Sequence, residues 1–455
     1  MRRFTIIFSL ALLVFTGAPL RAGTATNSLV WQTVAGRVTA DLHGEALWPL
    51  LEDIAHQTGW HIFVEPGVAR KADVKFSNLP TGEALKKLLG DLNFAFVPKT
   101  NEANHLYVFT TTMHAATQPV AAVEPEKTEP PKHVANELLV KVKPGTDIDA
   151  LAKSLGAKVV GRDDKLGIYR LQFTDAAATD TALASLKTNA TVAAVEYNYL
   201  LAPPPAPQKI ASTSAGPVSL TLNPPGDSGR VIVGLIDTPV QSLGTSLDPF
   251  LLKPISVTGD TTDLSSADPT HATSMAETIL RAMAAQGGST SAQILPVDVY
   301  GNSETATTWN VALGVQAAVN GGANVLNLSL SGTTDSAILS DVIQQAAAKG
   351  IIIFAAAGNQ PVATPTYPAA DSGVIAVAAT QGGQLAAYSN FGSFISLALP
   401  GASVVYLGNQ AFVVQGTSAA TAYASGVAAG TKNGTSMTWA QILAVMQQKF
   451  PVPQK

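Results

Sequence analysis

The sequence of 455 residues contains no cysteine. This absence excludes disulfide bonds, zinc sites built from thiolates and a cysteine nucleophile. Charged residues are scarce, at 13% of the chain, and the net charge is −4. We therefore expect no basic surface and no nucleic-acid partner. Histidine is rare in the C-terminal part, where His271 is the only one after His133. A residue so rare in that part of the chain is a candidate for chemistry.

The N-terminus begins Met1-Arg2-Arg3, continues with an apolar stretch over 4–15 and reaches small residues at 22–25. This pattern is typical of a secretory signal peptide, although a short buried helix is the alternative. Elsewhere no run reaches the roughly 18 apolar residues of a membrane span. We expect residues 1–25 to be removed on export, which makes the protein periplasmic or extracellular.

Two proline-rich segments divide the rest of the chain. Residues 113–135 and 201–226 lack apolar periodicity, which is typical of exposed linkers. They separate three pieces, at 27–112, 136–200 and 227–455. Each piece is long enough to form a domain of its own.

The first piece alternates helix-like and strand-like patterns. Apolar pairs recur at helical spacing over 46–55, and Thr58-Gly59 ends that helix. A second helix is predicted over 81–89, with Thr81 as its N-cap. Apolar runs at 94–97 and 106–109 predict a hairpin. Together they indicate a small α+β domain.

One string in this piece carries a resemblance. Leu79-Pro80-Thr81-Gly82-Glu83-Ala84-Leu85, followed by Leu88-Leu89, resembles the short N-terminal domain of secretins and TonB-dependent receptors. The resemblance implies an interaction module of the Gram-negative envelope, whose partner is an envelope protein. The alternative is any small α+β domain without that role.

The second piece has a repeated strand–helix–strand order. A strand at 137–142 ends at Pro144-Gly145, helices are predicted over 148–155 and 177–186, an alternating strand covers 167–173, and the last strand covers 192–197. Two β-α-β halves of this size predict a ferredoxin-like sandwich.

The third piece is α/β. Its apolar runs are typical of parallel strands buried on both faces, and helical stretches lie between them. We predict a doubly wound, mostly parallel sheet preceded by two small α+β domains. The runs are 231–236, 325–330, 351–356 and 374–379, with a weaker one at 294–299 that contains Pro296, and the helices include 305–319 and 336–348.

Four residues of this piece form a chemical set. Asp237 ends an apolar run, His271 opens a helix-like string, Asn359 follows Ala-Ala-Gly, and Ser418 lies in Gly-Thr-Ser before a run of small residues. An acid, an imidazole, an amide and a hydroxyl are the parts of a serine hydrolase. Each has an ordinary alternative as a turn or helix-capping residue, and Gly-Thr-Ser alone favours the cap. The conjunction of all four favours catalysis.

The strings around these residues resemble the subtilisin-like serine protease family over nearly the whole third piece. They are Val233-Gly234-Leu235-Ile236-Asp237-Thr238, His271-Ala272-Thr273-Ser274, Asn324-Val325-Leu326-Asn327-Leu328-Ser329-Leu330-Ser331-Gly332, Ala356-Ala357-Gly358-Asn359 and Gly416-Thr417-Ser418.

The resemblance implies a role for each residue. Ser418 is the nucleophile, His271 moves its proton, and Asp237 orients the imidazole. The oxyanion is bound by the Asn359 amide and the Ser418 N–H. The backbone of Ser329, Leu330 and Ser331 binds an extended polypeptide substrate as an added strand. The expected activity is that of a serine endopeptidase.

The second piece then resembles the propeptide of these proteases, with Val195-Glu196-Tyr197-Asn198-Tyr199 as its final strand. This implies a zymogen with its propeptide bound in cis. Self-cleavage at 199–230 would release the first domain together with the propeptide.

Several flanking residues depart from the family. Pro239, Ala272 and Ser331 stand where the family has glycine, and Ala422 where it has proline. The family's acidic and histidine residues after the Asp-Thr block are absent, so no cofactor is assigned and a calcium ion has no identifiable ligands.

Two other classes of protein share part of this pattern. A sedolisin-type carboxyl protease needs a glutamate and an aspartate where this chain has His271 and Asn359, so that alternative fails. A weak or inactive pseudoprotease, acting as an envelope binding protein through 27–112, stays open because of the altered flanks.

Overall fold

The computed structural model describes residues 27–32, 36–97, 104–120, 132–201, 206–210, 218–223, 230–244, 246–259, 262 and 264–453. The predicted signal peptide lies outside these residues. In the described part of the chain, no helix is long and apolar enough to cross a membrane. The chain separates into two compact units, Met1–Glu129 and Pro130–Lys455.

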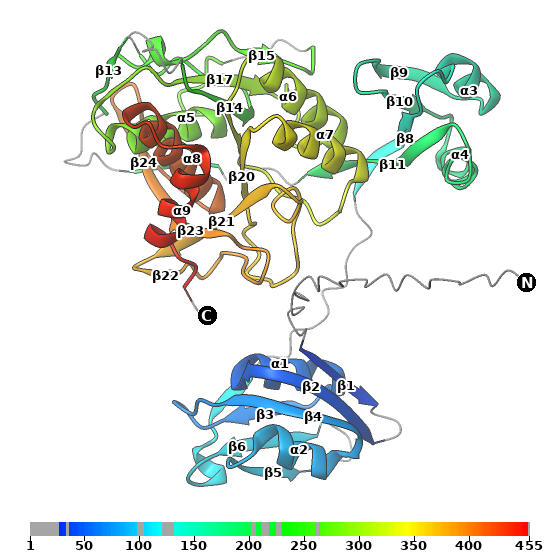
Figure 1. The fold of residues 1–455 in the computed structure, drawn as a ribbon, viewed down its shortest axis with the longest axis vertical. Coiled ribbons are helices and arrows are strands. Elements are labelled where there is room, and N and C mark those ends of the chain that lie inside the picture. The colour runs from blue at the N-terminus through cyan, green and yellow to red at the C-terminus, as the bar shows by residue number, and fades with distance from the viewer. Residues whose placement is uncertain are drawn as a thin grey trace, which may run out of the picture. The chain divides into compact units, whose positions relative to one another are not determined.

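In the described part of the first unit, helices α1 and α2 pack with two sheets around one core (Figure 1). The sheet orders are β1-β2-β4 and β5-β6-β3-β7. Gly59, at a φ of 69°, ends helix α1 as predicted. Its elements are β1 Ser28–Gln32, β2 Arg37–Ala46, α1 Leu47–Thr58, β3 His61–Val64, β4 Lys71–Pro80, α2 Thr81–Leu89, β5 Asn93–Val97, β6 His105–Phe109 and β7 Gln118–Val120.

Two sequence predictions for this unit were wrong. Thr81 is the first residue of α2 and not its cap, because its hydroxyl donates instead to the Gly36 carbonyl at 3.3 Å. Strand β7 lies inside the predicted linker 113–135, because three residues at the end of the unit pair with β3. A strand of three residues is too short for periodicity to show.

The second unit begins with a small domain of β-α-β-β-α-β order, as predicted. Its sheet order, β11-β8-β10-β9, places the first and last strands side by side. Both helices begin behind an aspartate whose side chain accepts backbone N–H bonds. The elements are β8 His133–Val142, α3 Ile148–Ser154, β9 Lys158–Asp163, β10 Ile168–Gln172, α4 Ala176–Leu186 and β11 Val192–Leu201.

The larger domain that follows confirms the predicted doubly wound α/β fold. Its sheet runs β15-β17-β14-β19-β20-β21 with parallel pairing, and β22 and β23 pair with β21. The strands are β14 Ile232–Asp237, β15 Ile255–Ser256, β17 Gln293–Asp298, β19 Val325–Leu328, β20 Ile352–Ala356, β21 Val374–Gln381, β22 Gln384–Leu385 and β23 Leu397–Pro400.

Helices cover both faces of this sheet. Helices α5 (His271–Ala284) and α8 (Thr417–Gly434) share one core cluster with residues of β14 and β21. Helices α6 (Thr308–Asn320) and α7 (Ala337–Ala348) lie side by side in the other cluster (Figure 1). Helix α9 (Trp439–Lys449) packs in the same cluster as α8.

Two predictions for this domain need correction, and a third is confirmed. Helix α6 begins at Thr308 and not at 305, because Ala306–Thr307 form strand β18 against β11 and Thr307 caps the helix. The weaker strand candidate that contains Pro296 is confirmed, because it forms β17 and pairs with β14. Inside the predicted linker 201–226, Gln208–Lys209 (β12) and Thr221–Leu222 (β13) are paired strands.

The small residues of α8 allow it to lie very close to α5. A methyl group on Gly426 would stand 2.4 Å from the Ile279 carbonyl oxygen, and one on Gly430 would stand 3.1 Å from the Met283 Cα. Both contacts join residues 147 apart in sequence, so the helices run parallel in a fixed register. His271 and Ser418 are also 147 residues apart, which places them at the same level of this helix pair.

Candidate active site

The four predicted residues belong to four different elements of the larger domain. Asp237 is the last residue of β14, His271 the first of α5, and Ser418 the second of α8, while Asn359 follows β20. Asp237, His271 and Ser418 are 2, 5 and 3% exposed. The carboxyl end of a parallel sheet is where open α/β folds bind ligands.

Asp237 and His271 form a buried hydrogen-bonded pair. Nδ1 of His271 lies 2.8 Å from each carboxylate oxygen of Asp237. The Thr238 N–H donates to one of these oxygens at 2.7 Å. Because Nδ1 faces the carboxylate, Nε2 is directed to the opposite side of the ring. Nε2 is buried and has no hydrogen-bond partner among the described residues.

The start of α5 fixes the histidine. Thr270 caps the helix by accepting the Thr273 N–H at 3.1 Å, and its hydroxyl lies 2.7 Å from the Pro239 carbonyl oxygen. The Ala272 N–H donates to the Thr238 hydroxyl at 2.9 Å. The two departures at 239 and 272 therefore take part in the hydrogen bonds that join β14 to α5.

Ser418 lies in the first turn of α8, where backbone N–H groups have no partner within the helix. Its hydroxyl donates to the Ser329 carbonyl at 3.1 Å, and the Ser329 hydroxyl donates to the Ser418 carbonyl at 3.1 Å. The nucleophile candidate is thus tied by two bonds to the segment that follows β19.

Asn359 is oriented by the residue before Ser418. Its Oδ1 accepts from the Thr417 N–H at 2.8 Å and from the Thr417 hydroxyl at 3.0 Å. Both bonds use the amide oxygen, so the Nδ2 group is left to donate elsewhere. Gly358, at a φ of 101°, approaches Asn390 so closely that a side chain does not fit there.

A cavity of about 220 Å³ lies beside Asn359, which is one of the residues that line it. Tyr388, Val413 and Gln415 line it together with Ala206 and Gln208 from the predicted linker. Gln208–Lys209 pair antiparallel with β25 (Gln410–Gln415), the strand that leads directly to Ser418. The segment Gln208–Lys209 therefore forms an added strand next to β25, beside the proposed site.

The predicted substrate strand Ser329-Leu330-Ser331 follows β19. Ser329 and Leu330 are buried and Ser331 is half-buried. The next residue, Gly332, exchanges two 2.8 Å backbone bonds with Tyr367. The Leu201 side chain lies 3.8 Å from where a Gly332 Cβ would be. The last residue of β11 thus reaches the end of this strand.

Strand β11 also covers the starts of two helices. The Asn198 side-chain oxygen accepts the Trp309 N–H of α6 at 3.1 Å. The Glu196 carboxylate accepts the Ala337 N–H of α7 at 2.9 Å and the Ser336 hydroxyl. Burial raises the pKa of Glu196 to about 7, although both bonds favour the charged form.

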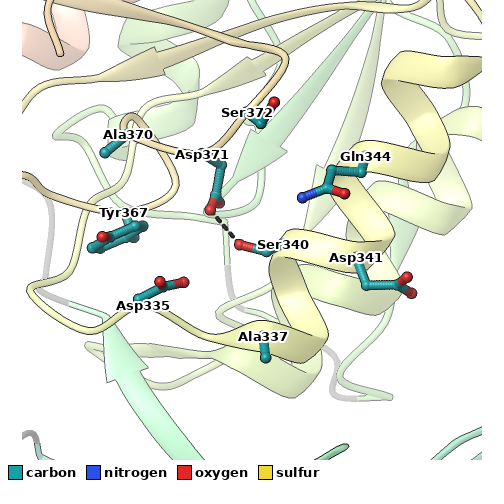
Figure 2. Close-up of a pocket in the computed structure, with 9 residues that line it drawn as sticks. All are labelled: Asp335, Ala337, Ser340, Asp341, Gln344, Tyr367, Ala370, Asp371 and Ser372. Carbon is teal, nitrogen blue, oxygen red and sulfur yellow. Dashed lines mark hydrogen bonds between the residues drawn. The ribbon is translucent and has the colours of Figure 1, made fainter. Parts of the chain in front are cut away.

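A second cavity, of about 480 Å³, lies beside the start of α7 and contains none of the four predicted catalytic residues. In Figure 2 the Ser340 hydroxyl and the Asp371 carboxylate point toward each other and form a hydrogen bond. Burial raises the pKa of Asp371 to about 6, and the charge of Asp335 adds to the effect.

No group of three or more histidine, aspartate or glutamate side chains in the described part of the chain could hold a metal ion.

The sequence predicted that Asp237, His271, Asn359 and Ser418 act together, and the elements that carry them meet at one edge of the sheet. The sequence analysis gave no role to Thr417, which orients Asn359 through two hydrogen bonds. Thr417 belongs to the Gly-Thr-Ser string, but only the folded chain shows that it contacts Asn359.

Two family models match the chain. The subtilase family matches residues 228–451, and the fervidolysin N-terminal prodomain matches residues 119–198. A thermostable alkaline protease of Halalkalibacterium halodurans is 36% identical over 169 residues, which cover 36% of this chain and 47% of the relative. Thermitase of Thermoactinomyces vulgaris is 39% identical over 145 residues, covering 31% and 52%.

The chain spans about half the length of the curated relatives it matches. Among solved structures, fervidolysin from Fervidobacterium pennivorans, described as a keratinolytic enzyme related to subtilisin, superposes with a TM-score of 0.55. The sequence identity is 19%, and the match covers 71% of this chain and 58% of that chain. This likeness concerns the fold.

Proposed function

The chain belongs to the subtilase family, and we propose that it is a serine endopeptidase made as a zymogen. The observation that carries this proposal is the register of α5 and α8. It supports a position level with Ser418 for Nε2 of His271, which has no hydrogen-bond partner in the described part of the chain, while Nδ1 is held by Asp237.

The proposed reaction uses these groups in sequence. Ser418 Oγ attacks the scissile carbonyl carbon as its proton passes to Nε2 of His271. The peptide C–N bond then breaks, and the imidazolium returns that proton to the leaving amine. Water hydrolyses the acyl-enzyme by the same proton path. Asp237 keeps Nδ1 protonated and stabilises the imidazolium charge.

The negative charge on the carbonyl oxygen needs donors already in place. The Ser418 N–H at the start of α8 is one, and the Asn359 Nδ2 group, directed by Thr417, is the other. A substrate would lie extended along Ser329–Ser331 with backbone pairing. The Ser418 hydroxyl now donates to the Ser329 carbonyl, so it must rotate to His271 before it attacks.

The zymogen's own cleavage is proposed to fall between Leu201 and Ala206. Leu201 ends β11 beside Gly332, and Ala206 lines the cavity that contains Asn359. Leu201 and Ala206 therefore both lie near the proposed site, and the sequence from one to the other is Leu-Ala-Pro-Pro-Pro-Ala. Cleavage there separates the prodomain, together with the first unit, from the protease.

The test is the intact mass of purified wild-type protein beside Ser418→Ala. We expect only the wild type to shorten, at a bond within 201–206. If both proteins stay at full length and neither cleaves a denatured protein substrate, the endopeptidase proposal is wrong. If both shorten, another protease makes the cut.

We further propose that the protein is exported by a Gram-negative cell and that residues 27–112 bind an envelope protein. The apolar stretch behind two arginines supports export, and the separate first unit supports a docking role. Cell fractionation with and without residues 27–112 tests both points. Finding the full-length protein in the cytoplasm would contradict export.

A further inference from the structure

A row of polar side chains lies buried behind Ser418, between α8 and the end of β19. It consists of Ser425, Asn327 and Ser329, none more than 2% exposed. Ser418 and Ser425 are seven residues apart, so they share one face of the helix. Asn327 and Ser329 alternate by two, so they share one side of an extended strand.

The hydrogen bonds of this row run in one direction. The Ser425 hydroxyl donates to Oδ1 of Asn327 at 3.0 Å. Nδ2 of Asn327 donates to the Ser329 hydroxyl oxygen at 2.8 Å. The Ser329 hydroxyl donates to the Ser418 carbonyl at 3.1 Å, and the Ser418 hydroxyl returns a bond to the Ser329 carbonyl.

The direction follows from the number of protons on each group. A serine hydroxyl has one proton to donate, and an amide presents a donor at one atom and an acceptor at the other. Ser329 can donate to Ser418 only while Asn327 presents its NH₂ to it. Ser425 enforces that orientation, because its hydroxyl satisfies the amide oxygen on the other side.

Removal of the Ser425 hydroxyl would leave a fully buried acceptor without a partner. The Asn327 amide could then turn over and present its oxygen to Ser329. The Ser329 proton would be drawn to Asn327 and away from the Ser418 carbonyl. One of the two bonds that join the substrate strand to the nucleophile would be lost.

We propose that Ser425 and Asn327 are positioning residues of this protease, which hold Ser329 in the register that Ser418 and an extended substrate both require. Neither touches the reacting atoms. They act through the orientation of one amide. The inference rests on the proposed endopeptidase function, because it assigns Ser418 as the nucleophile.

The test compares wild type with Ser425→Ala, Ser425→Thr and Ser425→Val in the full chain. On a chromogenic peptide, Ser425→Ala should lower kcat about tenfold with a smaller change in KM. Thr keeps the hydroxyl and Val has the same shape without it. We expect Ser425→Thr and Ser425→Val to lower the melting temperature by similar amounts, but only Ser425→Val to have a lower kcat than wild type.

Ser291→Ala is the matched control, because Ser291 also donates to an asparagine oxygen, that of Asn433. It should keep wild-type kcat. Equal kcat for Ser425→Ala and wild type, or equal losses for the Thr and Val variants, would overturn the positioning role.

A second measurement does not depend on activity. In a high-resolution crystal structure of Ser425→Ala, we expect the separation of Ser329 Oγ from the Ser418 carbonyl oxygen to exceed 3.5 Å, the outer limit of such a bond. An unchanged separation overturns the inference. If wild type cleaves no peptide, the endopeptidase proposal fails, and this structure still decides the role of Ser425.

Discussion

Asn359 has one acceptor and one donor group on its amide, and Thr417 determines which of them faces a substrate. Two bonds from Thr417 hold the oxygen, one from its N–H and one from its hydroxyl. Thr417→Val removes the second bond and keeps the first, and it also removes the acceptor of the Gly358 N–H, which bonds to this hydroxyl at 3.1 Å. A hydrogen bond of this kind contributes about 1 kcal/mol, so we predict a fall in kcat of about five- to tenfold with little change in KM.

Asn359→Ala removes the donor itself, and its kcat should fall further, by on the order of 10²–10³. Thr421→Val is the control, because the Thr421 hydroxyl bonds back to the Thr417 carbonyl and does not reach Asn359. Steady-state kinetics on one peptide compare the three variants. A Thr417→Val enzyme as slow as Asn359→Ala would show that the hydroxyl does more than orient Asn359, for example through its bond from the Gly358 N–H.

Ala272 departs from the family pattern, yet it is fully buried and its N–H bonds to Thr238. We predict that Ala272→Gly keeps this bond and wild-type kcat. It should destabilise the fold by about 1 kcal/mol, because glycine is a poor helix former. Thermal unfolding and kinetics measured together check both parts. A rise in kcat would mean that the alanine disturbs the site.

The catalytic candidates could be read from the sequence because their residue types are informative and their neighbours form specific strings. The residues that orient them could not. Ser425 looked like one small residue in an Ala/Gly-rich run, and Asn327 like part of an apolar strand. Their partners lie about 100 residues away, so only the folded chain shows the connection.

At the scale of elements, long apolar runs were predictable and two-residue strands were not. The sheet strands around Asp237 and the helices α5, α7 and α8 follow from composition and capping. β12 and β18 exist because other strands pair with them. Two residues have no periodicity, so the sequence gives no sign of them, and the start of α6 was misplaced for that reason.

The register of α5 and α8 depends on Gly426. A methyl group there would meet the Ile279 carbonyl oxygen at 2.4 Å, and backbone cannot move aside as a side-chain end can. We predict that Gly426→Ala costs about 1–3 kcal/mol of unfolding free energy through overpacking. The added methyl group would push α8 away from α5 and so separate Ser418 from His271. We therefore expect kcat to fall as well.

Gly434 is the matched control for this prediction. It is the last residue of the same helix, and a methyl group there meets nothing within 4 Å. Gly434→Ala should leave kcat unchanged and the stability equal or slightly higher. Denaturant unfolding measures both variants. Equal effects of the two substitutions would contradict the assigned helix register.

At the scale of the whole molecule, the small domain of residues 132–201 contacts the larger domain mainly through β11, and residues of β8 and β9 add to this contact. Gly161 of β9 permits the Trp309 ring to lie against it, since a Cβ there would stand 2.7 Å from that ring. Lys141 pairs with Asp341 on α7. The subtilase domain is therefore covered by its own prodomain at the starts of α6 and α7.

The Glu196 carboxylate makes this contact sensitive to pH. Docking raises its pKa from an ordinary 4.5 to about 7 through burial, so docking is accompanied by proton uptake. Affinity should be highest below about pH 4.5, fall as pH rises toward 7 and stay constant above. The negative charge of Asp335, on the larger domain, also raises the pKa of Glu196. The hydrogen bonds from Ser336 and Ala337 favour the charged carboxylate and partly offset this rise.

The shift sets an upper limit of about two orders of magnitude for the change in affinity. We predict that, after self-cleavage of the full chain, the prodomain coelutes with the protease on size exclusion at pH 5 and separates at pH 8. Glu196→Gln resembles the protonated acid and can still accept the Ala337 N–H. It should therefore stay bound at both pH values.

Asp180→Asn is the control, because Asp180 is an exposed acid on α4, and this variant should behave as wild type. Separation of the Glu196→Gln prodomain at pH 8 would show that another group governs release, because this variant has no charge at that position.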